Sequence, residues 1–144
     1  MKNKFIIYLS VIFFLLININ YAFSDDFVFD TSEIKILDNG NIIKATNGTA
    51  KSIKNNINIF AKKFEYNKKL SILNAEDGVT TATNENIQIK ANKFIYNEST
   101  SVLNAIGNVV IKDLIKKTFI KSQNIIYYID KKIIKSETKS SIED

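Results

Sequence analysis

The side chains that most often carry catalysis are missing from this sequence. The chain has 144 residues with no histidine and no cysteine, and all of its 20 basic residues are lysine. The common pairings of a nucleophile with a general base are therefore unavailable. A glycan-cleaving enzyme could still use carboxylates, but it needs two acids that face one cleft. The 15 acidic residues are scattered over polar positions instead, so we predict a protein that is not an enzyme.

Two kinds of charged cluster could still bind a ligand. Asp25-Asp26 and Glu76-Asp77 are adjacent acids, but adjacent acids without a wider set of oxygen ligands make a poor cation site. We therefore predict no metal and no cofactor. Paired lysines recur near the expected turns and could meet lipid phosphates as point charges, although we prefer a solvated outer face that discourages edge aggregation. These pairs are Lys62-Lys63, Lys68-Lys69, Lys116-Lys117 and Lys131-Lys132.

A repeat of about thirty residues organises most of the chain. The stretch FEYNKKLSILNA at 64–75 returns as FIYNESTSVLNA at 94–105. Weaker copies precede and follow these two, the last after one inserted residue, so that about four rows account for residues 27–136. Self-similarity at a fixed period is typical of an architecture built from stacked units.

Apolar side chains alternate with polar ones inside each row. NINIFA places Ile57, Ile59 and Ala61 on one side of an extended segment, and KFEY does the same with Phe64 and Tyr66. A period of two, with many β-branched and aromatic residues and no proline, indicates strands. Apolar spacing of three and four, which would indicate helices, is absent after residue 25. We therefore predict an all-β fold of about four antiparallel repeats.

Polar stretches separate the strand segments. NKK, NES and IDK suit tight turns, and we expect Asp77-Gly78 and Gly107-Asn108 to reverse the chain with positive φ. Each row then contains two or three short strands. A lone hairpin is marginal in water, so the stacked rows should share one elongated core.

The first 24 residues have the order of a secretory signal peptide. Lys2 and Lys4 precede an apolar run at 5–17, and Ala22 and Ser24 stand before a plausible cleavage point. The run is shorter than the roughly 20 residues that span a membrane, although an uncleaved inner-membrane anchor remains an alternative. Either interpretation predicts export. The exported domain would comprise 25–136, followed by a polar tail at 137–144 whose composition suggests disorder.

Charge and cysteine content limit the partners of the exported part. Without Lys2 and Lys4 the chain carries 18 basic and 15 acidic residues, a net charge of +3. This charge is too small to indicate nucleic acid, which needs a concentrated basic surface. No disulfide is possible, so stability must come from an apolar interior and backbone pairing.

The repeated rows resemble the OstA-like N-terminal domain family. NINIFAKKFEYNKKLSILNAEDGV and ENIQIKANKFIYNESTSVLNAIGNV carry the likeness, which covers about residues 27–136. The resemblance implies an elongated, twisted β-jellyroll, open at both ends, with an apolar groove for the acyl chains of lipopolysaccharide. Members of the family join end to end through edge strands. The implied location is the periplasm, with association with the outer membrane left open.

The resemblance also assigns a role to the inward apolar columns. It implies that they bind lipid, whereas the pattern alone is equally consistent with side chains that fill a core. Tyr66, Tyr96 and Tyr127 could stand at the mouth of the groove with hydroxyls in water, although ordinary core-edge tyrosines are the preferred interpretation. The proposed lipid-binding residues are Ile57, Ile59, Phe64, Tyr66, Leu73, Ile87, Ile89, Phe94, Tyr96, Leu103, Val109 and Ile111.

Two functions follow as expectations. The first is a periplasmic lipid-binding protein that shelters lipopolysaccharide acyl chains during transport to the outer membrane, with other β-jellyroll transport components as head-to-tail partners. The second is a structural adaptor that has a dry interior and pairs its edge strands with envelope β proteins. The family's assembly protein carries an outer-membrane barrel and cysteines that have no counterpart in these 144 residues, so its role is not expected here.

Overall fold

The computed structural model describes residues 27–82 and 85–143. The predicted signal peptide, residues 1–24, lies outside the described residues. Within the described ranges, no helix has the length and apolar character needed to cross a membrane.

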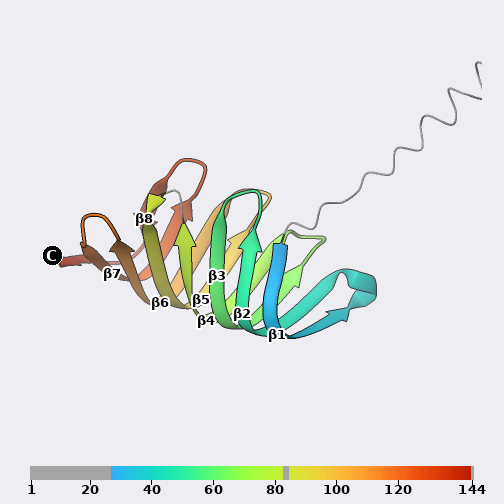
Figure 1. Cartoon of the computed structure of the whole chain (residues 1–144). Coiled ribbons are helices and arrows are strands. Elements are labelled where there is room, and N and C mark those ends of the chain that lie inside the picture. Colours follow the sequence, from blue (N-terminus) through green and yellow to red (C-terminus); the bar gives the residue numbers. More distant parts are fainter. Residues whose placement is uncertain (1–26, 83–84, 144) are drawn as a thin grey trace, which may run out of the picture.

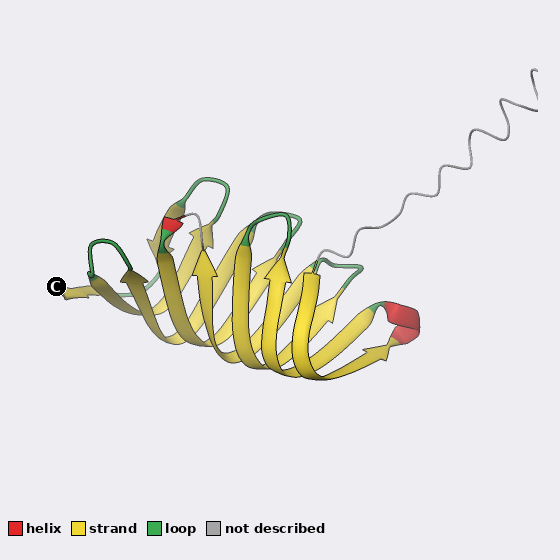
Figure 2. Cartoon of the chain, viewed as in Figure 1, coloured by secondary structure: helices red, strands yellow, loops and turns green. Residues whose placement is uncertain are grey.

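Nearly all of the described chain is β-structure (Figures 1 and 2). Consecutive strands pair antiparallel in the order β1 to β8, and β9 also pairs with β7. The prediction of an all-β fold of antiparallel repeats is confirmed. The strands are β1 (Phe27–Leu37), β2 (Ile42–Ser52), β3 (Ile57–Asn67), β4 (Ile72–Ala82), β5 (Ile87–Asn97), β6 (Val102–Asp113), β7 (Phe119–Tyr128), β8 (Ile133–Ser136) and β9 (Ser141–Glu143), with a 3-10 turn, η1 (Asp38–Gly40), after β1.

The long strands bend near their middles, so the sheet folds lengthwise into a trough (Figure 1). In β3 the buried positions alternate up to Ala61 and resume at Phe64, while Lys62 and Lys63 are both exposed. The phase of the alternation therefore changes at the bend. Because of this change, apolar side chains from both halves of the strand face the inside of the trough.

The bend divides the trough into two arms. The first arm comprises residues 27–31, 48–61, 78–82, 85–91 and 109–122, and the second comprises 33–46, 64–76, 93–106 and 124–136. Turns at 53–56, 85–86 and 114–118 end the first arm, and turns at 38–41, 68–71, 98–101 and 129–132 end the second. We call the line along which these two sets of turns face each other the mouth.

The predicted reversals at Asp77-Gly78 and Gly107-Asn108 are wrong, although the predicted positive φ occurs at every one of these residues except Gly78. Asp77, Gly107 and Asn108 have positive φ values of 51°, 79° and 49°. They lie inside β4 and β6, however, where the chain bends and continues. At Asp77-Gly78 the register of β3 with β4 is unbroken across the bend, whereas at Gly107-Asn108 a bulge shifts the register without ending the pairing. Each row is consequently two long strands, not two or three short ones.

Two positions at the bend require glycine, because the backbone of the neighbouring strand lies too close for a side chain. A Cβ atom at Gly78 would collide with the carbonyl oxygen of Phe60, and one at Gly48 would collide with that of Asp30. In the third row the glycine precedes the asparagine, as Gly107-Asn108, and the β5–β6 pairing shifts register there. This bulge accommodates the residue that the sequence inserts before the last row.

The predicted turns at NKK and NES are confirmed. Asn67 Oδ1 accepts a hydrogen bond from the backbone N–H of Leu70 at 3.1 Å, and Asn97 Oδ1 accepts one from Thr100 at 3.1 Å. The turn at IDK occupies the corresponding position in the last row. A backbone hydrogen bond of 3.0 Å from Lys132 N to Ile129 O closes it. The side-chain oxygen before each of the first two turns supplies the bond that a tight turn needs.

The polar tail is partly ordered, in contrast to the disorder expected from its composition. Residues 141–143 form β9 and pair with Phe119–Lys121 of β7. Thr138 Oγ1 accepts hydrogen bonds from the backbone N–H groups of Gln123 and Asn124 at 3.2 and 3.3 Å. The sheet therefore extends beyond the predicted boundary at residue 136.

Candidate functional site: the interior and mouth of the trough

The structure brings the predicted lipid-binding residues together inside the trough. Eleven of the twelve are at most 4% exposed, and Ile87 is partly buried and packs against them. They belong to one apolar cluster that draws on both arms. In this structure, side chains fill the space between the arms along these columns.

Aromatic rings connect the two arms across the interior. The ring of Phe27 on the first arm lies edge-on to Tyr66 and Tyr96 of the second arm, with ring centroids 4.8 and 5.7 Å apart. Phe29 meets Phe64 in the same way at 6.1 Å. Edge-to-face pairs of this kind stabilise a contact beyond the area that they bury. The arms are thus held together by side-chain packing as well as by the bend.

Apolar openings lie at the two ends of the trough. A pocket of about 310 Å³ at the β1 end is lined by Phe27, Val28, Phe29, Ile34, Ile36, Ile43, Tyr66 and Lys68. A pocket of about 360 Å³ towards β8 is lined by Ile87, Ile111, Asp113, Lys116, Thr118, Ile120 and Ile134. Each pocket combines apolar side chains with one lysine from a turn, and the pocket towards β8 also contains the Asp113 carboxylate. The pocket at the β1 end therefore suits an amphiphile with an anionic head better than the pocket towards β8 does.

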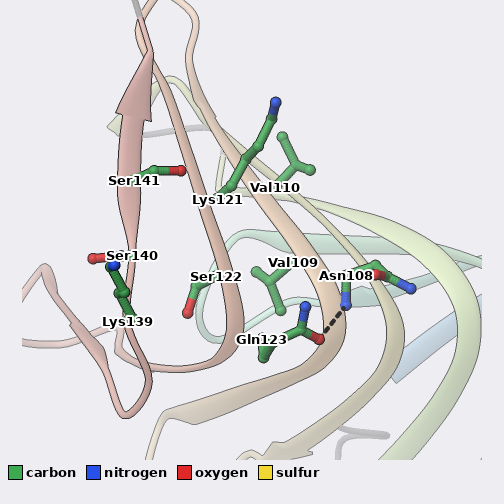
Figure 3. A pocket seen from close by; sticks show the side chains of 9 residues that line it. All are labelled: Asn108, Val109, Val110, Lys121, Ser122, Gln123, Lys139, Ser140 and Ser141. Atoms are coloured by element: carbon green, nitrogen blue, oxygen red, sulfur yellow. Dashed lines mark hydrogen bonds between the residues drawn. The ribbon is translucent and has the colours of Figure 1, made fainter.

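A more polar pocket of about 440 Å³ lies where residues 139–141 fold back along β6 and β7 (Figure 3). Gln123 Oε1 accepts a hydrogen bond from the backbone N–H of Asn108 at 3.4 Å (Figure 3). Sequence reasoning missed this pocket, because it exists only where the predicted tail joins the sheet. The residues that line it are Asn108, Val109, Val110, Lys121, Ser122, Gln123, Lys139, Ser140 and Ser141.

A buried polar cluster, which we call the first clasp, bridges the mouth. It consists of Ser52 and Asn55 from the first arm and Tyr96, Glu98 and Ser101 from the second. Ser52 Oγ donates to Glu98 Oε1 at 2.6 Å, and Asn55 Nδ2 donates to Tyr96 Oη and, at 3.3 Å, to Ser101 Oγ. Ser52, Glu98 and Ser101 are at most 3% exposed. The clasp therefore joins the arms through groups that are shielded from water.

The second clasp occupies the corresponding position one row later and consists of Glu85, Tyr127 and Lys132, with an ion pair in place of the hydrogen bonds of the first clasp. Glu85 and Tyr127 occupy the columns of Asn55 and Tyr96 in the repeat. Lys132 Nζ lies 3.5 Å from Glu85 Oε1. Burial, with a smaller contribution from the neighbouring Glu85 carboxylate, raises the pKa of Tyr127 to about 12.

The hydroxyls of the three tyrosines are buried. The interpretation that placed them in water at the mouth of the groove is therefore wrong. Tyr66, Tyr96 and Tyr127 are at most 1% exposed. Burial raises the pKa of Tyr96, and hydrogen bonds with Ser52 and Asn55 oppose part of that increase. The three residues are core tyrosines, and two of them take part in the clasps.

Comparison with known proteins adds one result. No model of a known protein family matches the chain, and no curated protein matches its sequence. Among solved structures it matches LptH, described as the LptA homologous periplasmic component of the conserved lipopolysaccharide transport device from Pseudomonas aeruginosa, with a TM-score of 0.69. The match covers 82% of this chain and 94% of the LptH chain at 5% sequence identity. The chain has the LptH fold.

The LptH-like fold confirms the expected jellyroll, a twisted antiparallel sheet that is not closed. It also explains why the clasps were missed. Their residues are polar positions near turns, and a row-by-row reading gives no reason to connect Ser52 with Glu98. Only the bend in the sheet, which brings the two arms face to face, creates that contact. The sequence offered one signal for the clasps, which is that Asn55 and Glu85 occupy the same column of the repeat.

The lysine pairs lie on the outside of the LptH-like trough or on its turns. Lys62 Nζ lies 3.5 Å from Asp77 Oδ2, and Lys63 Nζ lies 3.5 Å from Glu76 Oε2. Both lysines are largely exposed, so these pairs add little stability. Their position agrees with the preferred interpretation as a solvated face. Within the described ranges, no group of three or more acidic side chains is arranged to hold a metal ion.

Proposed function

We propose that this chain is a component of lipopolysaccharide transport in the periplasm and shelters acyl chains between the two arms of its trough. The proposal rests on one observation above all: the fold of LptH here encloses a continuous apolar interior that reaches from one end of the sheet to the other. No catalytic group is required, because the proposed work is binding and release.

The energetics favour hydrocarbon in such an interior. Each methylene that leaves water contributes about 0.8 kcal/mol, so a twelve-carbon chain gains up to roughly 10 kcal/mol before ordering costs. Part of that gain offsets the contacts between the arms that the chain displaces. The apolar pockets at the two ends offer further surface without such a cost.

Photo-crosslinking in cells tests the proposal. Crosslinkers at the inward positions Ile59, Phe94 and Leu103 should capture lipopolysaccharide, and crosslinkers at the outward positions Asn58 and Glu65 should not. The comparison of inward with outward positions shows which face of the sheet contacts lipid. Equal labelling at both sets, or no labelling, would contradict the proposal.

A matched pair at the β1 end avoids disturbing the core. Ile36 lines the end pocket and is 65% exposed, so a bulky crosslinker fits there without strain. Lys35 is its neighbour on the opposite face of the strand. Lipid capture at Ile36 but not at Lys35 supports the proposal, and equal capture at both positions argues against it.

A second candidate function, the structural adaptor, is favoured by the edge of the sheet. Among the described residues β1 pairs only with β2, and Val28, Ile34, Ile36 and Leu37 on β1 are 47–65% exposed. An open apolar edge can pair with a strand of another protein. This function predicts oligomers that form with rising concentration, no lipid in purified material, and loss of the oligomers in Ile36→Lys.

A further inference from the structure

The two arms are joined across the mouth by side chains alone in the described part of the chain. Backbone hydrogen bonds do connect turns, but they connect turns of the same arm. On the second arm, Glu98 N donates to Ser71 O at 2.9 Å and Ile129 N donates to Ser101 O at 3.0 Å. On the first arm, Leu114 N donates to Asn86 O at 2.9 Å. Each arm is thus a continuous backbone-linked sheet, and the mouth is a seam between the two.

The clasps are the polar part of that seam. Besides its bond to Glu98 Oε1, Ser52 Oγ lies 3.5 Å from Tyr96 Oη and accepts the backbone N–H of Asn55 at 3.3 Å. Lys54 Nζ adds a bond of 3.4 Å to the backbone oxygen of Glu98. Ser52, Tyr96 and Glu98 are shielded from water in the closed arrangement, but all of these polar groups belong to strand ends and turns along the mouth, so water can replace their partners when the seam opens. Opening therefore need not strand a buried polar group, which would be costly.

The apolar part of the seam behaves in the opposite way. When the arms separate, Phe27 loses its contact with Tyr66 and Tyr96, and the inward columns meet water. Exposure of this surface is unfavourable unless hydrocarbon covers it. An acyl chain between the arms supplies that cover and so binds the open arrangement better than the closed one. A ligand shifts an equilibrium only through such a difference in affinity.

We propose that the clasps close a lateral gate, and that acyl chains enter the trough through the mouth when the clasps part. This inference rests on the proposed function, because it concerns how the same interior is reached. It assigns Ser52, Asn55, Glu98 and Ser101 to the first gate position and Glu85, Tyr127 and Lys132 to the second. The occurrence of two clasps one repeat apart indicates a seam that opens along its length.

A reversible crosslink tests the gate in a chain that has no cysteine of its own. Asn55→Cys with Ser101→Cys places two thiols where side-chain atoms lie 3.3 Å apart across the mouth. We expect the oxidised protein to bind lipopolysaccharide and a fluorescent twelve-carbon fatty acid at least about tenfold more weakly than the same protein after reduction, since a tenfold change needs only 1.4 kcal/mol.

The matched control is a crosslink that leaves the mouth free. Lys44 and Glu65 are paired across β2 and β3 on the outer face of the second arm, with Nζ and Oε2 3.0 Å apart, so Lys44→Cys with Glu65→Cys ties two strands of one arm away from the mouth. Oxidation of this pair should leave lipid binding unchanged. If the Asn55–Ser101 crosslink leaves binding equally unchanged, lipid enters elsewhere and the gate is rejected, while the proposed function stands. If the folded wild-type chain binds neither lipid, both proposals are rejected.

A second measurement does not depend on the double variant. Ile53 and Leu70 are 55% and 60% exposed on turns of opposite arms, so spin labels at these positions report the width of the mouth. The distance between the labels should increase when lipopolysaccharide binds. An unchanged distance in protein that demonstrably carries lipid would overturn the gate.

Discussion

At the scale of the residue, the bend in the sheet depends on the absence of a methyl group. Gly78 lies against the backbone of Phe60, and a Cβ atom there would overlap its carbonyl oxygen. Gly78→Ala should therefore force β3 and β4 apart at the bend and lower the free energy of unfolding by about 1–3 kcal/mol, the usual cost of overpacking. Urea denaturation followed by circular dichroism measures the change.

Thr81→Ala is the matched control for Gly78→Ala. Thr81 lies on the same strand at a half-buried position on the outer face, so its loss should change the free energy of unfolding by less than about 0.5 kcal/mol. Equal stability of Gly78→Ala and the wild type would mean that the bend tolerates a side chain, contrary to the structure.

We expect the buried hydroxyl of Tyr127 to lower the free energy of unfolding at alkaline pH. Its pKa is raised to about 12 from an ordinary value of 10.0, so the folded state favours the neutral hydroxyl. This group leaves stability unchanged below pH 10 and lowers it as the pH rises towards 12, by at most about 1.4 kcal/mol per pH unit. The difference in unfolding free energy between wild type and Tyr127→Phe, measured from pH 8 to 12, isolates this effect from the lysines.

Tyr128→Phe serves as the comparison, because Tyr128 is a neighbouring tyrosine that is only half-buried. The unfolding free energy of Tyr128→Phe at pH 8 shows what the loss of a neighbouring tyrosine hydroxyl costs before any tyrosine ionises. A wild type and a Tyr127→Phe variant that lose stability in parallel above pH 10 would show that Tyr127 titrates normally in the folded protein.

The sequence was sufficient to place individual apolar residues but not the polar ones that matter at the mouth. A period of two determines which side of a strand a residue faces, and that is why Ile59, Phe94 and Leu103 lie inside as predicted. A contact such as Ser52 with Glu98 spans 46 positions and two arms. Local periodicity carries no information about a contact of that range.

At the scale of the element, bends and turns were confused because they use the same chemistry. Asn, Asp and Gly adopt positive φ at low cost, both in a hairpin turn and in a bulge inside a strand. Gly107 and Asn108, with φ of 79° and 49°, illustrate the bulge, and Asn56, with φ of 51°, closes a true turn. What separates the two cases is whether the pairing partner continues on both sides, which depends on the neighbouring strand.

The turn between β6 and β7 depends on one carboxylate. Asp113 Oδ1 accepts the backbone N–H groups of Lys116 and Ile115, each at 2.9 Å, and these bonds, that of Lys116 foremost, lower the pKa of Asp113 below 3.8. Its contribution to stability is therefore present above pH 3.8 and is lost as the pH falls through the lowered pKa. Asp113→Ala should lower the melting temperature at pH 7, and the difference from the wild type should shrink as the pH falls below 3.8.

Amide exchange locates that effect. The N–H groups of Ile115 and Lys116 should exchange faster in Asp113→Ala than in the wild type, while exchange in β3 and β4 stays the same. Uniformly faster exchange in every strand would indicate global destabilisation and would contradict a role confined to this turn.

At the scale of the whole molecule, contacts between the arms complete the fold. Phe27 is 5% exposed and packs on two rings of the opposite arm. Phe27→Ala should cost about 3 kcal/mol, as is usual when a buried aromatic residue is truncated. Val28→Ala, one residue away at a side chain that is 51% exposed, should cost much less. Thermal unfolding of the two variants checks the contrast, and similar melting temperatures would argue against packing between the arms.

The order of the strands has a consequence for size. Because each strand pairs with its neighbours in the chain, duplicating one internal row inserts two strands without disturbing the topology of the others. Strands are spaced roughly 4.8 Å apart, so each added row lengthens the molecule by roughly 10 Å. The number of rows therefore sets the length of the molecule. Duplication or loss of a single row would change this length while leaving the cross-section of the trough the same.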